Sequence, residues 1–167
     1  MENELHWAGG MNKPLAILLY IISAAFILYG LFHTGKFKLP PYQKIMRHTG
    51  RVVTDFYVLY GENVYFNMGL LCAFGTTLML VYGTDLNGAT LCGIFTIMGF
   101  GAFGKHLRNI APVVAGAMIC THVNLWDPRY PSITLAILFS TGLAPIAGQF
   151  GVFWGLVTGF LHVNTVM

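Results

Sequence analysis

Four polar side chains stand together inside the apolar second half of the chain. They are Lys105, His106, Arg108 and Asn109. Two glycines, Gly101 and Gly104, precede them, and apolar runs lie on both sides. Cationic side chains and the free N–H groups of a helix N-terminus both attract anions. The cluster therefore predicts a binding site for an anionic or carboxylate-bearing solute, and the alternative is an ordinary short basic turn in the cytoplasm.

Two acids lie near apolar sequence upstream of this cluster. Asp55 and Glu62 are seven positions apart, so they would share one face if the segment between them were helical. A carboxylate there could couple solute movement to a proton or cation, with Asn67 supplying a further oxygen. The alternative is an interfacial helix whose acids face water and pair with Arg47 or Arg51.

Polar residues also occur late in two apolar runs, as the pairs His122/Asn124 and His162/Asn164. A polar side chain inside a span usually faces the bundle interior, where a neutral imidazole can relay protons. A hydrated histidine at the membrane interface is the alternative for His122, which is close to Trp126. The sequence has neither an H-E-x-x-H motif nor a His/Cys cluster at ligand spacing, so no metal and no cofactor is expected.

The glycines of this region also spell G-x-G-x-x-G, at Gly99, Gly101 and Gly104. In a dinucleotide site that pattern lies between a strand and an uninterrupted helix, with an acid further on, and Asp127 is near the usual offset. Here Pro112 follows soon after the third glycine, and a chain with 20 glycines produces such matches by chance. Close helix packing or a helix break is expected instead of nucleotide binding.

The elements that must position these residues are predicted to be helices dissolved in a lipid bilayer. The 167 residues are 56% apolar and only 9% charged, whereas a soluble domain is about 25% charged. The net charge of +3 comes from basic residues beside apolar runs, which is typical of membrane loops and not of nucleic-acid binding. Three cysteines, Cys72, Cys92 and Cys120, lie within apolar runs and indicate packing residues, not disulfides.

Six apolar segments predict an all-α polytopic membrane bundle. They span 15–32, about 64–82, 89–104, 110–126, 132–148 and 151–167. The first has 18 residues and no cleavage signal, and at 1.5 Å per residue it just crosses a hydrocarbon core of about 30 Å. Others are short or interrupted by glycine or proline, which predicts broken or re-entrant helices. Gly151, Gly155 and Gly159 recur every four residues and would allow a neighbouring helix to approach closely.

Basic residues are unevenly distributed between the connecting loops. With the N-terminus outside and six crossings, only Lys13 and Arg129 lie on the outer side. Seven lie on the inner side: Lys36, Lys38, Lys44, Arg47, Arg51, Lys105 and Arg108. The excess predicts a protein of the cytoplasmic (inner) membrane whose loop 33–51 is cytoplasmic. Pro40-Pro41 predicts that no helix continues through that loop.

Four stretches of the sequence carry a family likeness. They are Val53-Thr54-Asp55 with Gly61 and Asn67-Met68-Gly69-Leu70, Gly99-Phe100 with Phe103-Gly104-Lys105-His106 and Asn109, Leu143-Ala144-Pro145, and Gly159-Phe160-Leu161-His162. They resemble a family of polytopic prokaryotic membrane proteins described as domain of unknown function 1576. The likeness runs from about residue 15 to the end. It implies that this chain is equivalent to an N-terminal half, because family members look roughly twice as long, and it supplies no substrate.

The sequence thus predicts one transmembrane domain over 1–167, forming half of a pseudo-symmetric unit with a second half or a second copy. The apolar run that closes the chain without a polar tail fits this expectation. The favoured function is non-enzymatic: secondary transport of a small polar or anionic solute, because short interrupted spans are typical of substrate sites in such transporters. One alternative is a structural or accessory membrane subunit. Another is a membrane-embedded enzyme, which requires His106, His122 and His162 to converge.

Overall fold

A computed structural model describes residues 2–33, 39–51 and 55–167, with side chains from residue 12 onward except 34–41 and 52–54. Lys36, Lys38 and Val53-Thr54 therefore lie outside the described residues. Within them, all regular structure is helical. The helices are α1 (Glu2–Phe32), α2 (Leu39–Ile45), α3 (Phe56–Tyr60), α4 (Asn63–Val81), α5 (Gly88–Phe100), η1 (Gly101–Phe103), α6 (Leu107–Val123), α7 (Pro131–Ser140), η2 (Thr141–Leu143), α8 (Ala144–Phe150) and α9 (Val152–Val166).

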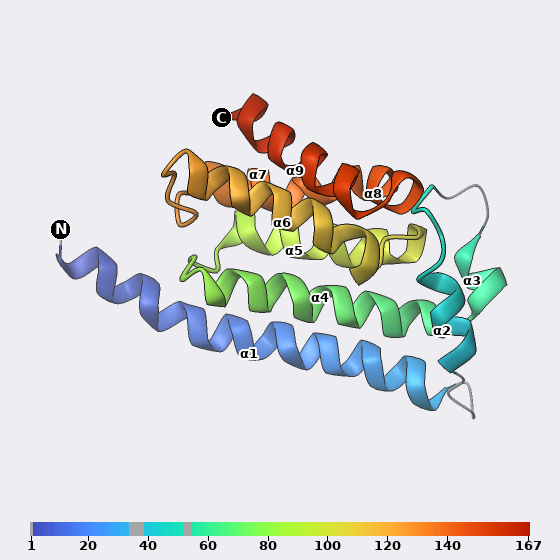
Figure 1. Ribbon diagram of the computed structural model, residues 1–167. Coiled ribbons are helices and arrows are strands. Elements are labelled where there is room, and N and C mark those ends of the chain that lie inside the picture. Colours follow the sequence, from blue (N-terminus) through green and yellow to red (C-terminus); the bar gives the residue numbers. More distant parts are fainter. Residues whose placement is uncertain (1, 34–38, 52–54) are drawn as a thin grey trace.

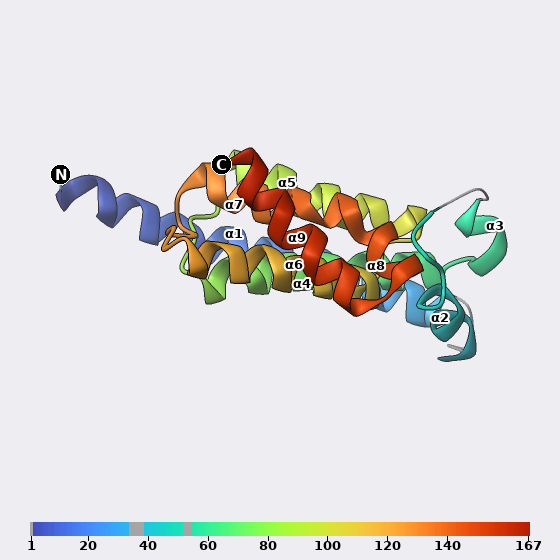
Figure 2. The same ribbon diagram turned by 45° about the horizontal axis from the view of Figure 1, so that its top comes forward.

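The long helices lie side by side along one direction, and the short helices α2 and α3 gather at one end (Figure 1). The chain runs the length of the bundle six times, in α1, α4, α5, α6, the broken helix α7–η2–α8, and α9 (Figure 2). The segments Asn12–Phe32, Asn63–Val81 and Pro131–Phe150 are long and apolar enough to cross a membrane, and three shorter apolar helices accompany them. The predicted all-α bundle with apolar, broken helices is confirmed.

Glycines bring some of these helices into backbone contact. A Cβ atom added to Gly159 of α9 would lie 1.9 Å from the carbonyl oxygen of Val113 in α6. One added to Gly116 of α6 would lie 2.0 Å from the carbonyl oxygen of Leu156 in α9. The close approach expected from the glycine spacing therefore occurs within the chain, between α6 and α9.

Three helix boundaries differ from those expected. The first helix starts at Glu2, well before the apolar run begins. Pro40-Pro41 does not prevent a helix but lies in the first turn of α2, where a missing N–H group leaves no helical hydrogen bond unmade. Pro112 lies inside α6, which starts at Leu107 and continues past it.

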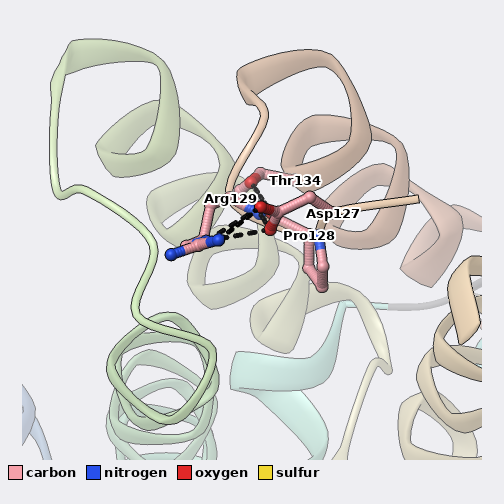
Figure 3. Close-up of polar contacts among 4 residues, drawn as sticks. All are labelled: Asp127, Pro128, Arg129 and Thr134. Atoms are coloured by element: carbon pink, nitrogen blue, oxygen red, sulfur yellow. Dashed lines mark hydrogen bonds and ion pairs between the residues drawn. The ribbon is translucent and has the colours of Figure 1, made fainter. Parts of the chain in front are cut away.

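The two ends of the bundle are built differently. We call the end that holds α2, α3 and the start of α6 the cavity end, and the end that holds the turns 82–87 and 124–130 the turn end. At the turn end, Asn12 of α1 donates to Asp85 Oδ1 (2.9 Å) and accepts from the backbone N–H of Leu86 (2.6 Å). Arg129 and Asp127 form an exposed ion pair, with Nη2 2.6 Å from Oδ2 (Figure 3).

Candidate functional site

The turn between α5 and α6 is held by a buried asparagine of a neighbouring helix. Nδ2 of Asn67 donates to the carbonyl oxygens of Gly101 (3.0 Å) and Lys105 (2.7 Å), while its Oδ1 has no hydrogen-bond partner in the part of the chain that the structure describes. Gly101 is closely packed, because an added Cβ would lie 2.9 Å from Cδ1 of Leu71 and the leucine side chain would have to shift. Gly104 has φ +92°, a left-handed conformation that favours glycine. Two of the three glycines of the G-x-G-x-x-G match, Gly101 and Gly104, are therefore explained by packing and turn geometry, whereas a Cβ added to Gly99 would meet nothing within 4 Å.

The same turn caps the first turn of α6. The backbone N–H of His106 donates to Asn109 Oδ1 (3.0 Å), and Asn109 Nδ2 donates back to the Gly104 carbonyl (3.1 Å). His106 and Asn109 are each only 1% exposed. Residues 104–106 are thus tucked into the cavity end of the bundle and do not hang freely in solvent, although Arg108 is exposed.

Residues 46–51, from the loop expected to be cytoplasmic, pack over this helix start. A Cβ atom on Gly148 of α8 would lie 2.2 Å from the Thr49 carbonyl oxygen. Gly50, at φ +85°, places its Cα so that an added Cβ would lie 2.9 Å from Nδ2 of Asn109. Nε2 of His106 lies 2.9 Å from the His48 carbonyl oxygen. Three points of close contact therefore bring this loop, α6 and α8 together.

A cavity of about 120 Å³ lies between these three segments. Its polar lining is Arg47, His48, His106, Arg108 and Asn109, and its apolar wall comes from Met46 and from the α8–α9 corner. We call it the basic cavity. A water molecule occupies about 30 Å³ in the liquid, so the space suits a few waters or one small oxyanion. Among the described residues that line it there is no carboxylate.

Lys105 is buried beside the basic cavity but does not line it. Its side chain is 6% exposed, and Nζ lies 3.4 Å from Thr141 Oγ1 in the break of α7–η2–α8. The ammonium also sits 4.2 Å from the centroid of the Phe100 ring. Burial lowers the pKa of Lys105 to about 8. In the described part of the chain Lys105 forms no ion pair, so the turn between α5 and α6 carries an uncompensated positive charge at neutral pH.

The residues expected to couple an ion are separated. Asp55 is exposed and caps α3, where its Oδ1 accepts from the N–H of Tyr57 (2.8 Å). Glu62 is half-buried just before α4, and Gly61, at φ +54°, separates the two helices, so Asp55 and Glu62 do not share a helix face. Of Asp55, Glu62 and Asn67, only Asn67 contacts the turn between α5 and α6, through its hydrogen bond to the Lys105 carbonyl.

The remaining polar candidates lie toward the opposite end of the bundle. His122 is exposed near the end of α6, about 24 Å along the helix from His106 at 1.5 Å per residue. His162 is half-buried and Asn164 exposed near the end of α9. The three histidines that a membrane-embedded enzyme would need therefore do not converge. Among the described residues, no group of three or more His, Cys, Asp or Glu side chains could hold a metal ion.

Sequence reasoning missed two residues of the site. Arg47 was expected only as an ion-pair partner for an acid, and His48 was not singled out, yet both line the basic cavity. They lie 58 or more positions before His106 in the sequence. Gly50 and Gly148 mark the places where the loop 46–51 lies against α6 and α8. The sequence shows that these positions are glycine but not which segment packs against them.

Fold and composition together define an all-α, membrane-type helical bundle with a basic site at one end. The family model described as "Protein of unknown function (DUF1576)" matches residues 34–167, and the chain belongs to this family. The resemblance seen in the sequence is thereby confirmed. No curated protein and no solved structure matches the chain.

Proposed function

We propose that this protein is a secondary-transporter-like membrane protein that moves a small anionic solute, and that the basic cavity is its binding site. The observation that carries the proposal is the cavity itself. Four of its five polar lining residues are arginine or histidine, and they come from two distant segments of the chain. An ionised or titratable group within an apolar bundle is costly, and in membrane proteins such groups mark solute and ion pathways.

The surroundings of the cavity add positive potential without a compensating acid. The cavity lies at the N-terminus of α6, where the helix dipole favours an anion. Lys105, buried one residue before the helix cap, adds a full charge nearby. The volume of about 120 Å³ limits the solute to the size of phosphate, sulfate or a short carboxylate.

Broken helices beside the site support the same function. The span 131–150 is interrupted at Thr141–Leu143, and Thr141 is the residue that Lys105 contacts. In secondary transporters, discontinuous helices of this kind border the substrate site and supply the moving parts. An accessory subunit would need neither a buried lysine nor an interrupted span next to it.

The distribution of basic residues supports an orientation with the cavity end in the cytoplasm of the inner membrane. Lys44, Arg47, Arg51 and Arg108 belong to the cavity end, whereas Arg129 belongs to the turn end. Positive residues are retained on the cytoplasmic side of short loops. The cavity would then face the cytoplasm in the conformation described, and a second half or second copy would complete the pathway.

Solute uptake into proteoliposomes tests the proposal. The purified chain should take up radiolabelled phosphate, sulfate or acetate faster than empty vesicles. Arg108→Gln and Lys105→Met should each lower uptake at least tenfold, because each removes a positive charge at or beside the cavity. Lys44→Met is the matched control, since Lys44 is exposed on α2 and should leave uptake unchanged. Vesicles that take up none of the three anions would contradict transport and favour the accessory role.

A further inference from the structure

We propose that the basic cavity binds its anion together with one proton, and that Nδ1 of His106 is the atom that takes that proton. This inference rests on the proposed anion site and names the coupling ion. It also replaces the carboxylates Asp55 and Glu62 as coupling group, since neither lines the cavity.

The tautomer of His106 follows from the contact that its Nε2 makes. Nε2 lies 2.9 Å from the carbonyl oxygen of His48, and a carbonyl can only accept a hydrogen bond. Nε2 therefore carries the hydrogen. In the neutral ring Nδ1 then holds a lone pair. Within the described residues this buried nitrogen makes no hydrogen bond of normal geometry, although the backbone N–H of Asn109 faces the ring in a capping-box arrangement. A buried polar atom left unpaired costs about 1–3 kcal/mol, so its retention points to a partner that arrives from the cavity.

The groups that face His106 keep its ring neutral while the cavity is empty. Burial is the main cause that lowers the pKa of His106. The hydrogen bond to the His48 carbonyl raises it, and the positive charges of Arg108 on α6 and His48 on the covering loop lower it further. Arg47 lines the same cavity, and Lys105 precedes His106 in the chain. The α8–α9 corner contributes only Ala147, Gly148, Gly151 and Val152, which carry no charge.

An anion in the cavity reverses this balance. Its negative charge offsets the arginines and favours the imidazolium form. A proton from solution then bonds to Nδ1, and the new N–H donates to an anion oxygen. The site gains one anion and one proton and returns both on release. An acid oxyanion such as hydrogen phosphate could instead bring the proton on its own O–H and donate it to the lone pair, with the same total.

Calorimetric titration of the detergent-solubilised chain with sulfate tests the proton. Sulfate carries no proton near neutral pH, so any proton taken up must reside on the protein. Titrations in buffers of different ionisation enthalpy should report close to one proton per bound sulfate at pH 7.5. Sulfate affinity should fall about tenfold per pH unit as the pH rises through this range, as linkage requires.

Variants of His106 and Arg108 separate the proton site from the anion site. His106→Gln keeps a side-chain donor for the His48 carbonyl but cannot be protonated. Made together with Lys105→Met, which removes the neighbouring amine whose pKa is about 8, it should leave a sulfate affinity that no longer changes with pH, whereas Lys105→Met alone should keep the proton uptake. Arg108→Gln should weaken sulfate binding at least tenfold while keeping the uptake near one proton per anion, and its exposed position makes a folding failure improbable on physical grounds. Lys44→Gln should bind like the unmodified chain. Sulfate binding without proton uptake in the unmodified chain would overturn the inference, even if His106→Gln failed to fold.

The outcome also separates this inference from the transport proposal. Proton-linked sulfate binding without uptake into vesicles would leave the site standing and overturn transport. Uptake of sulfate into vesicles together with binding that does not change with pH would support transport and overturn the protonation of His106. A phosphate headgroup shares the chemistry of a free oxyanion, so the titration is repeated in nanodiscs of phosphatidylcholine with and without phosphatidate. Unchanged sulfate binding assigns the site to a free anion, whereas loss of binding in phosphatidate assigns it to lipid and overturns transport.

Discussion

The cavity end and the turn end of the bundle treat charge in opposite ways. At the turn end, Arg129 lies in solvent against Asp127, and this contact lowers the pKa of the carboxyl through hydrogen bonds from the guanidinium and the backbone (Figure 3). At the cavity end, Lys105 is 6% exposed with no ion-pair partner in the described part of the chain. An exposed pair contributes little to stability and costs little.

The difference shows which end of the bundle holds a buried charge that does not stabilise the fold. A buried cation beside apolar helices lowers the stability of the fold unless an opposite charge reaches it. A loop that needed only to connect two helices could have used the arrangement of the turn end. The cavity end therefore accepts a destabilising charge, which an anion from solution would relieve.

The largest effect is expected from the asparagine that holds the turn at each end. Asn67→Ala removes the donor to the carbonyls of Gly101 and Lys105 in a buried setting and should destabilise the chain by about 2–4 kcal/mol. Asn12→Ala removes two hydrogen bonds at the half-exposed turn end, where water can replace them, and should cost about 1 kcal/mol. Thermal unfolding in detergent measures both. Equal losses of stability in the two variants would mean that both ends depend equally on their asparagine hydrogen bonds.

A smaller effect is expected from glycines on either side of the comparison. Gly148→Ala would place a methyl group 2.2 Å from the Thr49 carbonyl, so the covering loop must shift, at a cost of about 1–3 kcal/mol. Gly88→Ala at the turn end meets nothing within 4 Å and should be neutral or slightly stabilising. Hydrogen exchange should show faster exchange at 46–51 in Gly148→Ala alone. Unchanged protection there would show that the loop does not depend on this contact.

The smallest effect concerns pH. The pKa of Lys105 is about 8 in the folded chain and 10.5 as its ordinary value, so the unfolded state binds more protons between these pH values. Stability then rises with pH across that window. The melting temperature of the unmodified chain, relative to Lys105→Met, should increase by a few degrees between pH 7.5 and 9.5, because about 1 kcal/mol shifts it by about 2–4 °C at this size.

Asp127→Asn is the control for that measurement. It removes the exposed carboxylate at the turn end and should leave the same pH difference intact. A pH difference that disappeared with Asp127→Asn, or that persisted in Lys105→Met, would assign it to another group.

The parts of the fold that the sequence predicted are those that depend on local composition. Six apolar runs gave six passes of helix, although α6 starts at Leu107, three residues before the segment expected from 110. The predicted helix boundaries were wrong at Pro40, Pro41 and Pro112. A proline interrupts a helix where it removes a needed hydrogen bond or clashes with the preceding turn, and the sequence alone did not show whether that happens at these positions. Position within the first turn, or packing against α9, decides that outcome.

The candidate site was predicted in part. His106, Arg108 and Asn109 were chosen from their spacing and do line one cavity. Lys105 was chosen with them, yet its side chain turns toward Thr141, because adjacent residues at a helix cap point in different directions. Arg47 and His48 could not be found, since their contact with His106 is set by how distant segments fold over one another.

The backbone contact between α6 and α9 has a mechanical consequence. With carbonyl groups of one helix seated on glycines of the other, neither helix can slide or rotate alone without a steric clash. We therefore expect the two helices to move together. The same packing extends to α8, because a Cβ added to Gly155 of α9 would lie 2.7 Å from the Cβ of Ala147. Any force that displaces one of these three helices would displace the other two.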